Sequence, residues 1–267
     1  MPDDSTKMGA SRQALNLSNA GAPGFASETR VQLPQANSKI LQQDIQLIQI
    51  VDAALADATL RSGPHLVCYP GCTQCCHGAF AINPLDALRL RTAFTEMSIQ
   101  NPAQAAAIAE RARQYLAEFG PSFPGNRETG VLGITPEDEA AFEDFANEAT
   151  CPALNPVTGL CEVYSARPMT CRIFGPPVRM NPKPQDTVPA PDDSEDSKGL
   201  AVCELCFTEA TPEEIAASEM TVPWAEEQAI LDQLGQLGRL AQMPPNAGST
   251  IVAYCLTLPE FPSQEPS

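Results

Sequence analysis

Residues 68–76 of the chain read Cys68-Tyr69-Pro70-Gly71-Cys72-Thr73-Gln74-Cys75-Cys76. Within this stretch, Cys72 and Cys75 form a C-x-x-C pair. That spacing lets one turn direct two sulfur atoms at the same metal ion, at about 2.3 Å from each. Gly71 permits a turn beside these sulfur atoms, because glycine adopts backbone conformations that other residues avoid. The stretch therefore predicts an irregular loop that binds a metal.

Six further cysteines follow, and five of them also stand in connections between predicted helices. Cys203 and Cys206 form a second C-x-x-C pair. One such pair could equally be a redox dithiol, but two pairs together favour metal binding. Cys255 stands apart, and we expect it to be a buried structural thiol. The candidate metal ligands are the other nine cysteines: Cys68, Cys72, Cys75, Cys76, Cys151, Cys161, Cys171, Cys203 and Cys206.

The charge balance of the 267 residues excludes several classes of function. Lys and Arg number 16 against 33 Asp and Glu, which gives a formal net charge of −17. A protein that binds the phosphate backbone needs a positive face, so we expect no nucleic-acid partner. An acidic membrane surface would also repel the chain. Its most apolar stretch, around 40–55, is interrupted by Gln and Asp, so we expect no membrane span.

The cellular compartment bears on what the cysteines do. The first thirty residues lack the continuous apolar run of a secretory signal, which predicts a cytoplasmic protein. Thiols are kept reduced in the cytoplasm, so clustered cysteines there are expected to hold a metal more often than to form disulfides.

Three segments lack the apolar periodicity of packed elements. Residues 1–36 predict a disordered N-terminal arm, and residues 259–267 predict a disordered tail. Residues 176–198 combine repeated Pro with a run of Asp and Glu, which predicts a disordered insertion. We therefore expect a single cysteine-cluster metal-binding domain over residues 37–258, interrupted by that insertion.

The remaining pattern is helical and predicts a mainly α fold. Apolar residues repeat every three or four positions over 40–55, which predicts a helix with Ser38 as a possible N-cap and an end near Gly63. A last helix is expected over about 223–241, and residues 251–256 are the best candidate strand. Four more helices should begin where a capping residue precedes proline: Asn83-Pro84, Asn101-Pro102, Thr135-Pro136 and Thr211-Pro212. The expected architecture is a small helical domain whose irregular cysteine-rich loops gather around one or two metal sites.

The order of the cysteine motifs resembles a known family. After residues 68–76 come Cys151-Pro152-Ala153-Leu154 and then the run from Gly159 to Phe174, GLCEVYSARPMTCRIF. Over about residues 68 to 206 this resembles the YkgJ-type cysteine-cluster family of CxxCxxCC proteins, with the pattern C-x-x-C-C, C-P-x-L and C-x-x-Y-x-x-R-P-x-x-C-R-x-F. The resemblance implies chelation of zinc or iron by these cysteines, and it implies no established reaction. The long gap between Cys76 and Cys151, and the insertion before Cys203, depart from the pattern.

Several other residues of these motifs could support the site. Arg167 and Arg172 flank Cys171, and each could either donate N–H groups to sulfur or pair with a carboxylate. Tyr164 and Phe174 are expected to pack beside the thiols and shield them from water. His77 and His65 are expected to be ordinary imidazoles rather than ligands.

Three functional hypotheses follow. The first is a cytoplasmic metal-binding protein that chelates zinc or iron through its cysteine cluster. The second is an iron–sulfur enzyme with redox or protein-modifying activity, since flagellin lysine methylases carry what looks like a similar cluster. The third is a thiol-based metal-delivery protein in which Cys203 and Cys206 exchange metal with a partner. Four-cysteine sets suit zinc and iron–sulfur clusters alike, so the sequence leaves the metal open. It also names no protein partner.

Overall fold

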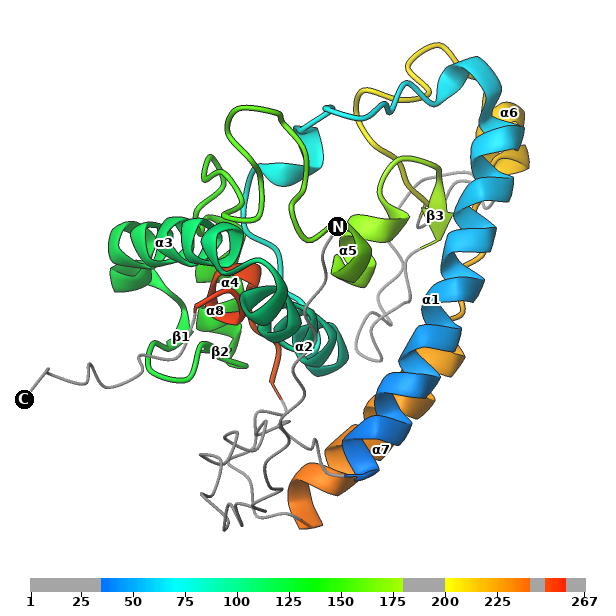
Figure 1. Cartoon of the computed structure of the whole chain (residues 1–267). Helices are drawn as coiled ribbons and strands as arrows, with labels where there is room; N and C mark the ends of the chain where they lie inside the picture. Colours follow the sequence, from blue (N-terminus) through cyan, green and yellow to red (C-terminus); the bar gives the residue numbers. More distant parts are fainter. Residues whose placement is uncertain (1–34, 180–199, 241–247, 258–267) are drawn as a thin grey trace, which may run out of the picture. The chain divides into compact units, whose positions relative to one another are not determined.

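The computed structural model describes residues 35–179, 200–240 and 248–257, which all belong to one compact unit of the chain, Leu33–Ser267 (Figure 1). These residues are mainly helical, as the sequence predicts. The α-helices are α1 (Gln35–Ser62), α2 (Pro84–Gln100), α3 (Pro102–Phe119), α4 (Pro136–Glu143), α5 (Met169–Ile173), α6 (Pro212–Ala217), α7 (Trp224–Leu240) and α8 (Val252–Cys255). Single 3₁₀ turns are η1 (Gly63–His65), η2 (Gln74–Cys76), η3 (Gly120–Ser122) and η4 (Tyr164–Ala166). The predicted tail and nearly all of the predicted arm and insertion lie outside the described residues.

The four predicted helix starts at a capping residue and proline are confirmed. Asn83 Oδ1 accepts hydrogen bonds from the backbone N–H groups of Leu85 and Asp86 and so caps α2. Asn101 caps α3 in the same way, and Thr135 and Thr211 form capping boxes at α4 and α6. The prediction that Ser38 caps the first helix is wrong, because α1 begins at Gln35 and contains Ser38.

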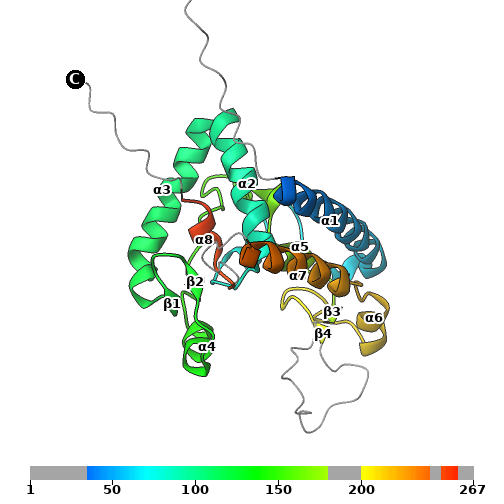
Figure 2. The ribbon, with the colours of Figure 1, turned by 90° about the horizontal axis from the view of Figure 1, so that it is seen from below.

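Helix α2 packs against four other helices. It contacts α1, α3, α7 and α8, while α1 and α7 lie side by side (Figures 1 and 2). One apolar core joins Leu90 of α2 to Ile108 of α3, and a second joins Val51 of α1 to Ile173 of α5. In the described part of the chain no helix has the length and apolar character needed to cross a membrane.

The predicted strand over residues 251–256 is wrong, because Val252–Cys255 form the short helix α8. Its Val252 and Cys255 side chains are buried in the core that α2 and α3 share. A short apolar run fits a buried strand and a buried helical turn equally well, so periodicity cannot separate the two. An isolated β-bridge occurs just before α8, where Thr250 and Ile82 exchange two backbone hydrogen bonds of 2.9 and 2.8 Å.

Strands are confined to two short antiparallel ladders. Strand β1 (Gly125–Asn126) pairs with β2 (Val131–Leu132), and β3 (Val178–Arg179) pairs with β4 (Leu200–Ala201). Strand β3 falls within the first four residues of the predicted insertion. The second ladder therefore brings the chain on either side of residues 180–199 together, two residues before Cys203.

A buried ionic network connects three helices. Arg89 of α2 donates to both carboxylate oxygens of Asp44 on α1, at 2.6 and 2.5 Å, and to Asp86 Oδ1 at 2.7 Å. Asp86 also accepts the backbone N–H of Met169, the first residue of α5, at 2.9 Å. The carboxylates are almost fully buried, so Arg89 is their compensating charge.

Replacing Arg89 should therefore destabilise the whole unit. Arg89→Met leaves two carboxylates buried without a cation, and we expect a loss of about 3–5 kcal/mol in the free energy of unfolding, measured with urea. Arg113→Met removes an exposed pair with Glu110 and is the matched control, expected to change stability by less than about 1 kcal/mol. Equal stability of the two variants would contradict this role for Arg89.

Glu227 of α7 enlarges the negative charge of the same region. Only 6% of this residue is exposed, and its Oε1 accepts a 2.8 Å hydrogen bond from Asn83. Burial raises the pKa of Glu227, and the nearby Asp86 and Asp44 raise it further. A raised pKa means that the neutral form is favoured in the fold, so stability from this group is lost as the pH rises through the folded pKa.

Glu227→Gln should consequently raise stability at neutral pH. The amide keeps an acceptor for Asn83 and carries no charge. We expect a higher urea midpoint than wild type at pH 7.5, with the difference vanishing as the pH falls toward 4.5. Glu226→Gln, at the exposed neighbouring position, should track wild type throughout. A Glu227→Gln advantage that is independent of pH would argue against a buried, charged Glu227.

Candidate metal centre

The structure sorts the nine candidate ligands into two sets. All ten cysteines are free thiols. Cys68 interacts electrostatically with Cys206, Cys203 and Cys72, and we call these four the outer thiols. Cys75, Cys76, Cys151, Cys161 and Cys171 interact with one another in the same way, and we call these five the inner thiols. Cys255 lies apart from both sets, 2% exposed in the core beside α2 and α3.

Backbone hydrogen bonds join the loops that carry the inner thiols. The N–H of Cys151 donates to the carbonyl of Cys76 at 2.8 Å, so two loops separated by 75 positions run together at their cysteines. Cys161 pairs with Leu154 in an isolated antiparallel bridge. Cys171 arrives on the helix α5, whose first N–H is held by Asp86.

Backbone N–H groups affect the ionisation of two inner thiols. The amides of Ala153 and Leu154 lower the pKa of Cys151, and the amide of Val163 lowers that of Cys161. Burial nevertheless raises the pKa of Cys151 to about 12 and that of Cys161 above its ordinary value. The amides favour the thiolate while burial opposes it. A bound cation would stabilise the thiolate further and outweigh the effect of burial.

The adjacent thiols Cys75 and Cys76 share a hydrogen bond. That bond lowers the pKa of Cys75 to about 6, with a further lowering by Arg167, against the opposing effect of burial. The same bond raises the pKa of Cys76, together with burial and the neighbouring thiols. The pair therefore loses its first proton easily and its second with difficulty, as expected where two anionic forms lie side by side.

The two arginines that flank Cys171 play different parts. Arg172 donates to Asp52 of α1 at 2.6 Å and to the carbonyl of Ser165, so it takes the salt-bridge alternative. The Arg167 guanidinium lies 3.9 Å from the centre of the Tyr164 ring and favours the thiolates of Cys75 and Cys161. Its buried Nε has no hydrogen-bond partner among the described residues. Arg167 thus supplies the positive charge beside the inner thiols.

Arg111 of α3 fixes the inner loops, a role that the sequence analysis missed. Its Nε donates to the carbonyl of Pro152 at 2.9 Å, and its Nη2 bonds the carboxylate of Glu162. Pro152 and Glu162 directly follow Cys151 and Cys161 in the chain. No local signal marks Arg111, because its partners lie 41 and 51 positions away.

The aromatic residues and histidines around the thiols take other roles than ligation or cover. Tyr164 is 61% exposed and Phe174 is 44% exposed, so the prediction that they shield the thiols is wrong. Tyr164 instead stacks under Arg167. His65 lies 3.6 Å from a carboxylate oxygen of Glu214 and stacks on Phe207, and His77 lies 3.5 Å from the hydroxyl of Thr150.

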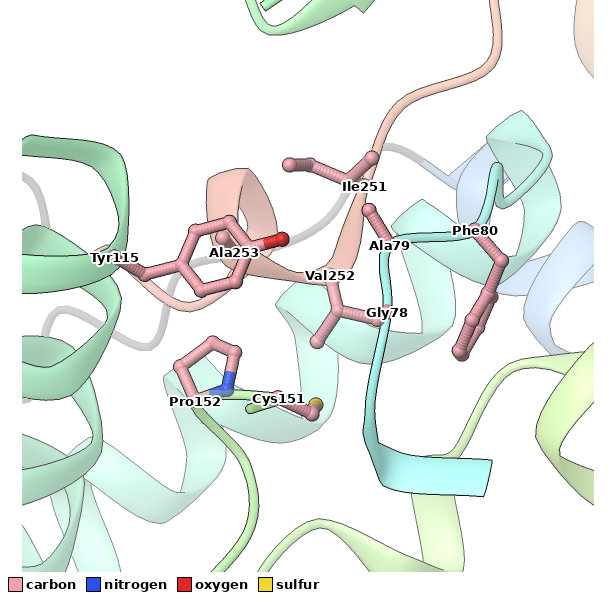
Figure 3. Close-up of a pocket in the computed structure, with 9 residues that line it drawn as sticks. All are labelled: Gly78, Ala79, Phe80, Tyr115, Cys151, Pro152, Ile251, Val252 and Ala253. Carbon is pink, nitrogen blue, oxygen red and sulfur yellow. The ribbon is translucent and has the colours of Figure 1, made fainter. Parts of the chain in front are cut away.

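A small cavity lies behind Cys151. Gly78, Tyr115, Cys151, Pro152 and Val252 are among the residues that line it, and the hydroxyl of Tyr115 points into it (Figure 3). Its volume of about 20 Å³ has room for about one water molecule.

The donor set suits a soft or borderline metal, although it is not yet assembled. Among residues 35–179, 200–240 and 248–257, no three His, Cys, Asp or Glu side chains converge closely enough to hold a metal ion as they stand. Sulfur donors whose thiolate form is favoured by backbone N–H groups nevertheless match the chemistry of zinc or iron thiolate sites.

Comparison with known proteins agrees with this chemistry. Residues 67–187 match the model of the CxxCxxCC family, described as a "putative zinc- or iron-chelating domain". The match contains Cys68, Cys72 and all five inner thiols, and it ends before Cys203. No curated protein and no solved structure matches the chain. Over residues 67–187, this match confirms the resemblance to the CxxCxxCC family that the cysteine motifs indicate.

Proposed function

We propose that the chain is a metal-binding protein that holds zinc or iron at the inner thiols. The observation that carries the proposal is that two loops and the helix α5 bring the five inner thiols to one region, where the N–H of Cys151 donates to the carbonyl of Cys76 at 2.8 Å and Arg167 supplies positive charge. The family match supports metal chelation in general. The assignment to Cys75, Cys76, Cys151, Cys161 and Cys171 rests on the geometry of those loops.

Electrostatics favours a cation at this point. Burial raises the pKa of Cys151 and Cys171, so both resist ionisation in the absence of metal. A divalent cation reverses that preference, because it binds the thiolate and displaces the proton. A site with four thiolates around one divalent ion carries a net charge near −2, and Arg167 offsets part of it.

The frame around the site fits a metal that is held firmly. Arg111 and Asp86 hold the chain beside three of the five thiols, and the small cavity of Figure 3 borders Cys151. We further propose that the protein works in the cytoplasm, where the ten free thiols stay reduced.

Metal content tests the proposal. Full-length protein purified under anaerobic, reducing conditions should contain at least one zinc or iron per chain by elemental analysis. Cys151→Ser/Cys161→Ser should hold one metal ion per chain fewer than wild type, and Cys255→Ser, at the core thiol, should match wild type. An iron–sulfur centre would show visible absorption that dithionite bleaches, and a zinc site would be colourless. A folded wild-type protein without stoichiometric metal would overturn the proposal.

The Arg111 contacts lead to a second prediction about affinity. Arg111→Met frees the backbone after Cys151 and the side chain after Cys161, so the inner thiols must be ordered by the metal itself. We expect zinc affinity to fall about 10- to 100-fold, measured by competition with a chromophoric chelator. Arg113→Met, on the same helix with a partner inside that helix, is the control and should bind like wild type. Unchanged affinity in Arg111→Met would show that these contacts do not position the ligands.

A further inference from the structure

We propose that the outer thiols Cys68, Cys72, Cys203 and Cys206 form a second metal site that binds one zinc ion, separate from the inner thiols. This goes beyond the proposed function, because Cys203 and Cys206 follow the segment that matches the family model. The second site joins the family segment to the part of the chain after residue 199. Its role is structural, as a clasp between two loops.

The first observation is the separation of two sulfur atoms. Cys68 Sγ lies 3.9 Å from Cys206 Sγ, although the two residues are 138 positions apart in the chain. Four sulfur atoms at about 2.3 Å from a tetrahedral zinc ion lie about 3.8 Å from one another. The Cys68–Cys206 pair therefore already has the spacing of one edge of the tetrahedron.

The second observation is the shape of the two loops. The N–H of Cys72 donates to the carbonyl of Tyr69, and the N–H of Cys206 donates to the carbonyl of Cys203, each at 2.9 Å. Both loops are thus closed turns, each held by a backbone hydrogen bond that ends at one of the cysteines.

Contacts outside the thiols hold the two loops face to face. Gln74 bonds Glu204 through their side chains, which links the loop of Cys72 to that of Cys206. The N–H of Phe207 donates to the carbonyl of His65 at 2.9 Å, and the two rings stack. Phe207 directly follows Cys206 and has a φ of +59°, a conformation that a bulky residue adopts only when its surroundings impose it.

The structure also keeps space clear beside Cys68. Gly175 has a φ of +123°, and a Cβ atom there would lie 3.3 Å from Cys68 Sγ and 3.2 Å from Leu66 Cδ1. Any other residue would crowd the sulfur. The thiol is therefore free to rotate toward the other three, and a change of χ1 rotamer moves a cysteine sulfur by roughly 3 Å.

Apolar packing alone gives this region little stability. The cluster around it contains just three buried residues, Cys203, Cys206 and Phe207, with a few half-buried side chains packed against them. Two of these three are the proposed ligands. A zinc ion bound by loops with so small a core contributes folding free energy directly, because the site exists only in the folded chain.

Paired knock-outs separate the two sites in the full-length protein. Cys203→Ser/Cys206→Ser should lose one zinc per chain and keep the inner metal, while Cys151→Ser/Cys161→Ser should keep one zinc per chain. Cys255→Ser is the control for removal of a thiol and should keep the wild-type content. Substituting cobalt for zinc in the Cys151→Ser/Cys161→Ser variant should give the ligand-field bands of tetrahedral cobalt with four sulfur ligands.

The outcomes distinguish this inference from the proposed function. Wild-type metal content in Cys203→Ser/Cys206→Ser would overturn the second site and leave the inner site intact. Loss of all metal from that variant, with a circular dichroism spectrum like that of wild type, would indicate one shared site and also overturn it. If that variant unfolds, the cobalt spectrum decides: bands with fewer than four sulfur ligands, or no binding, overturn the inference. Iron in place of zinc at the outer thiols would overturn the choice of metal.

Discussion

The fold depends on one buried cation. Arg89 satisfies Asp44 and Asp86 at once, and Asp86 in turn holds the first N–H of α5. Arg89 Nη1 also donates to the carbonyl of Arg167 at 3.3 Å, so the same side chain reaches the backbone of the residue whose guanidinium faces the inner thiols. The ion pairs of Arg89 with Asp44 and Asp86 therefore both hold α1 against α2 and position Cys171. Carboxylates this deeply buried are costly without their partner, which makes the arrangement specific.

The helices supply the order that the cysteine loops lack. Irregular backbone lets several sulfur atoms approach one point, but it gives those sulfur atoms no fixed position of its own. Long polar side chains provide it here: Arg111 reaches from α3 to the loops of Cys151 and Cys161, and Arg172 ties the segment before Cys171 to α1 through Asp52. The metal chemistry of this chain is thus supported by arginine–carboxylate and arginine–carbonyl contacts across long sequence separations.

Local signals in the sequence predict much of the frame and little of the site's internal arrangement. Asn83-Pro84 and Thr211-Pro212 mark helix starts because capping depends on neighbouring residues alone. The short apolar run at 251–256 misled, since its helical turn is set by the helices around it. Spacing identified nine cysteines, yet their division into outer and inner thiols depends on which loops the fold brings together. The sequence could not predict the different partners of Arg167 and Arg172 either, because Asp52 lies 120 positions from Arg172.

The ladder of β3 and β4 places Cys203 independently of the number of residues between the two strands. Arg179 pairs with Leu200, so the two ends of the twenty-residue stretch between them lie next to each other. Cys203 follows two positions after the ladder, so that pairing places it. Residues 180–199 could therefore lengthen, shorten or change composition during evolution without moving a ligand. They are also the natural position for a fluorescent or affinity label that must not disturb the cysteines.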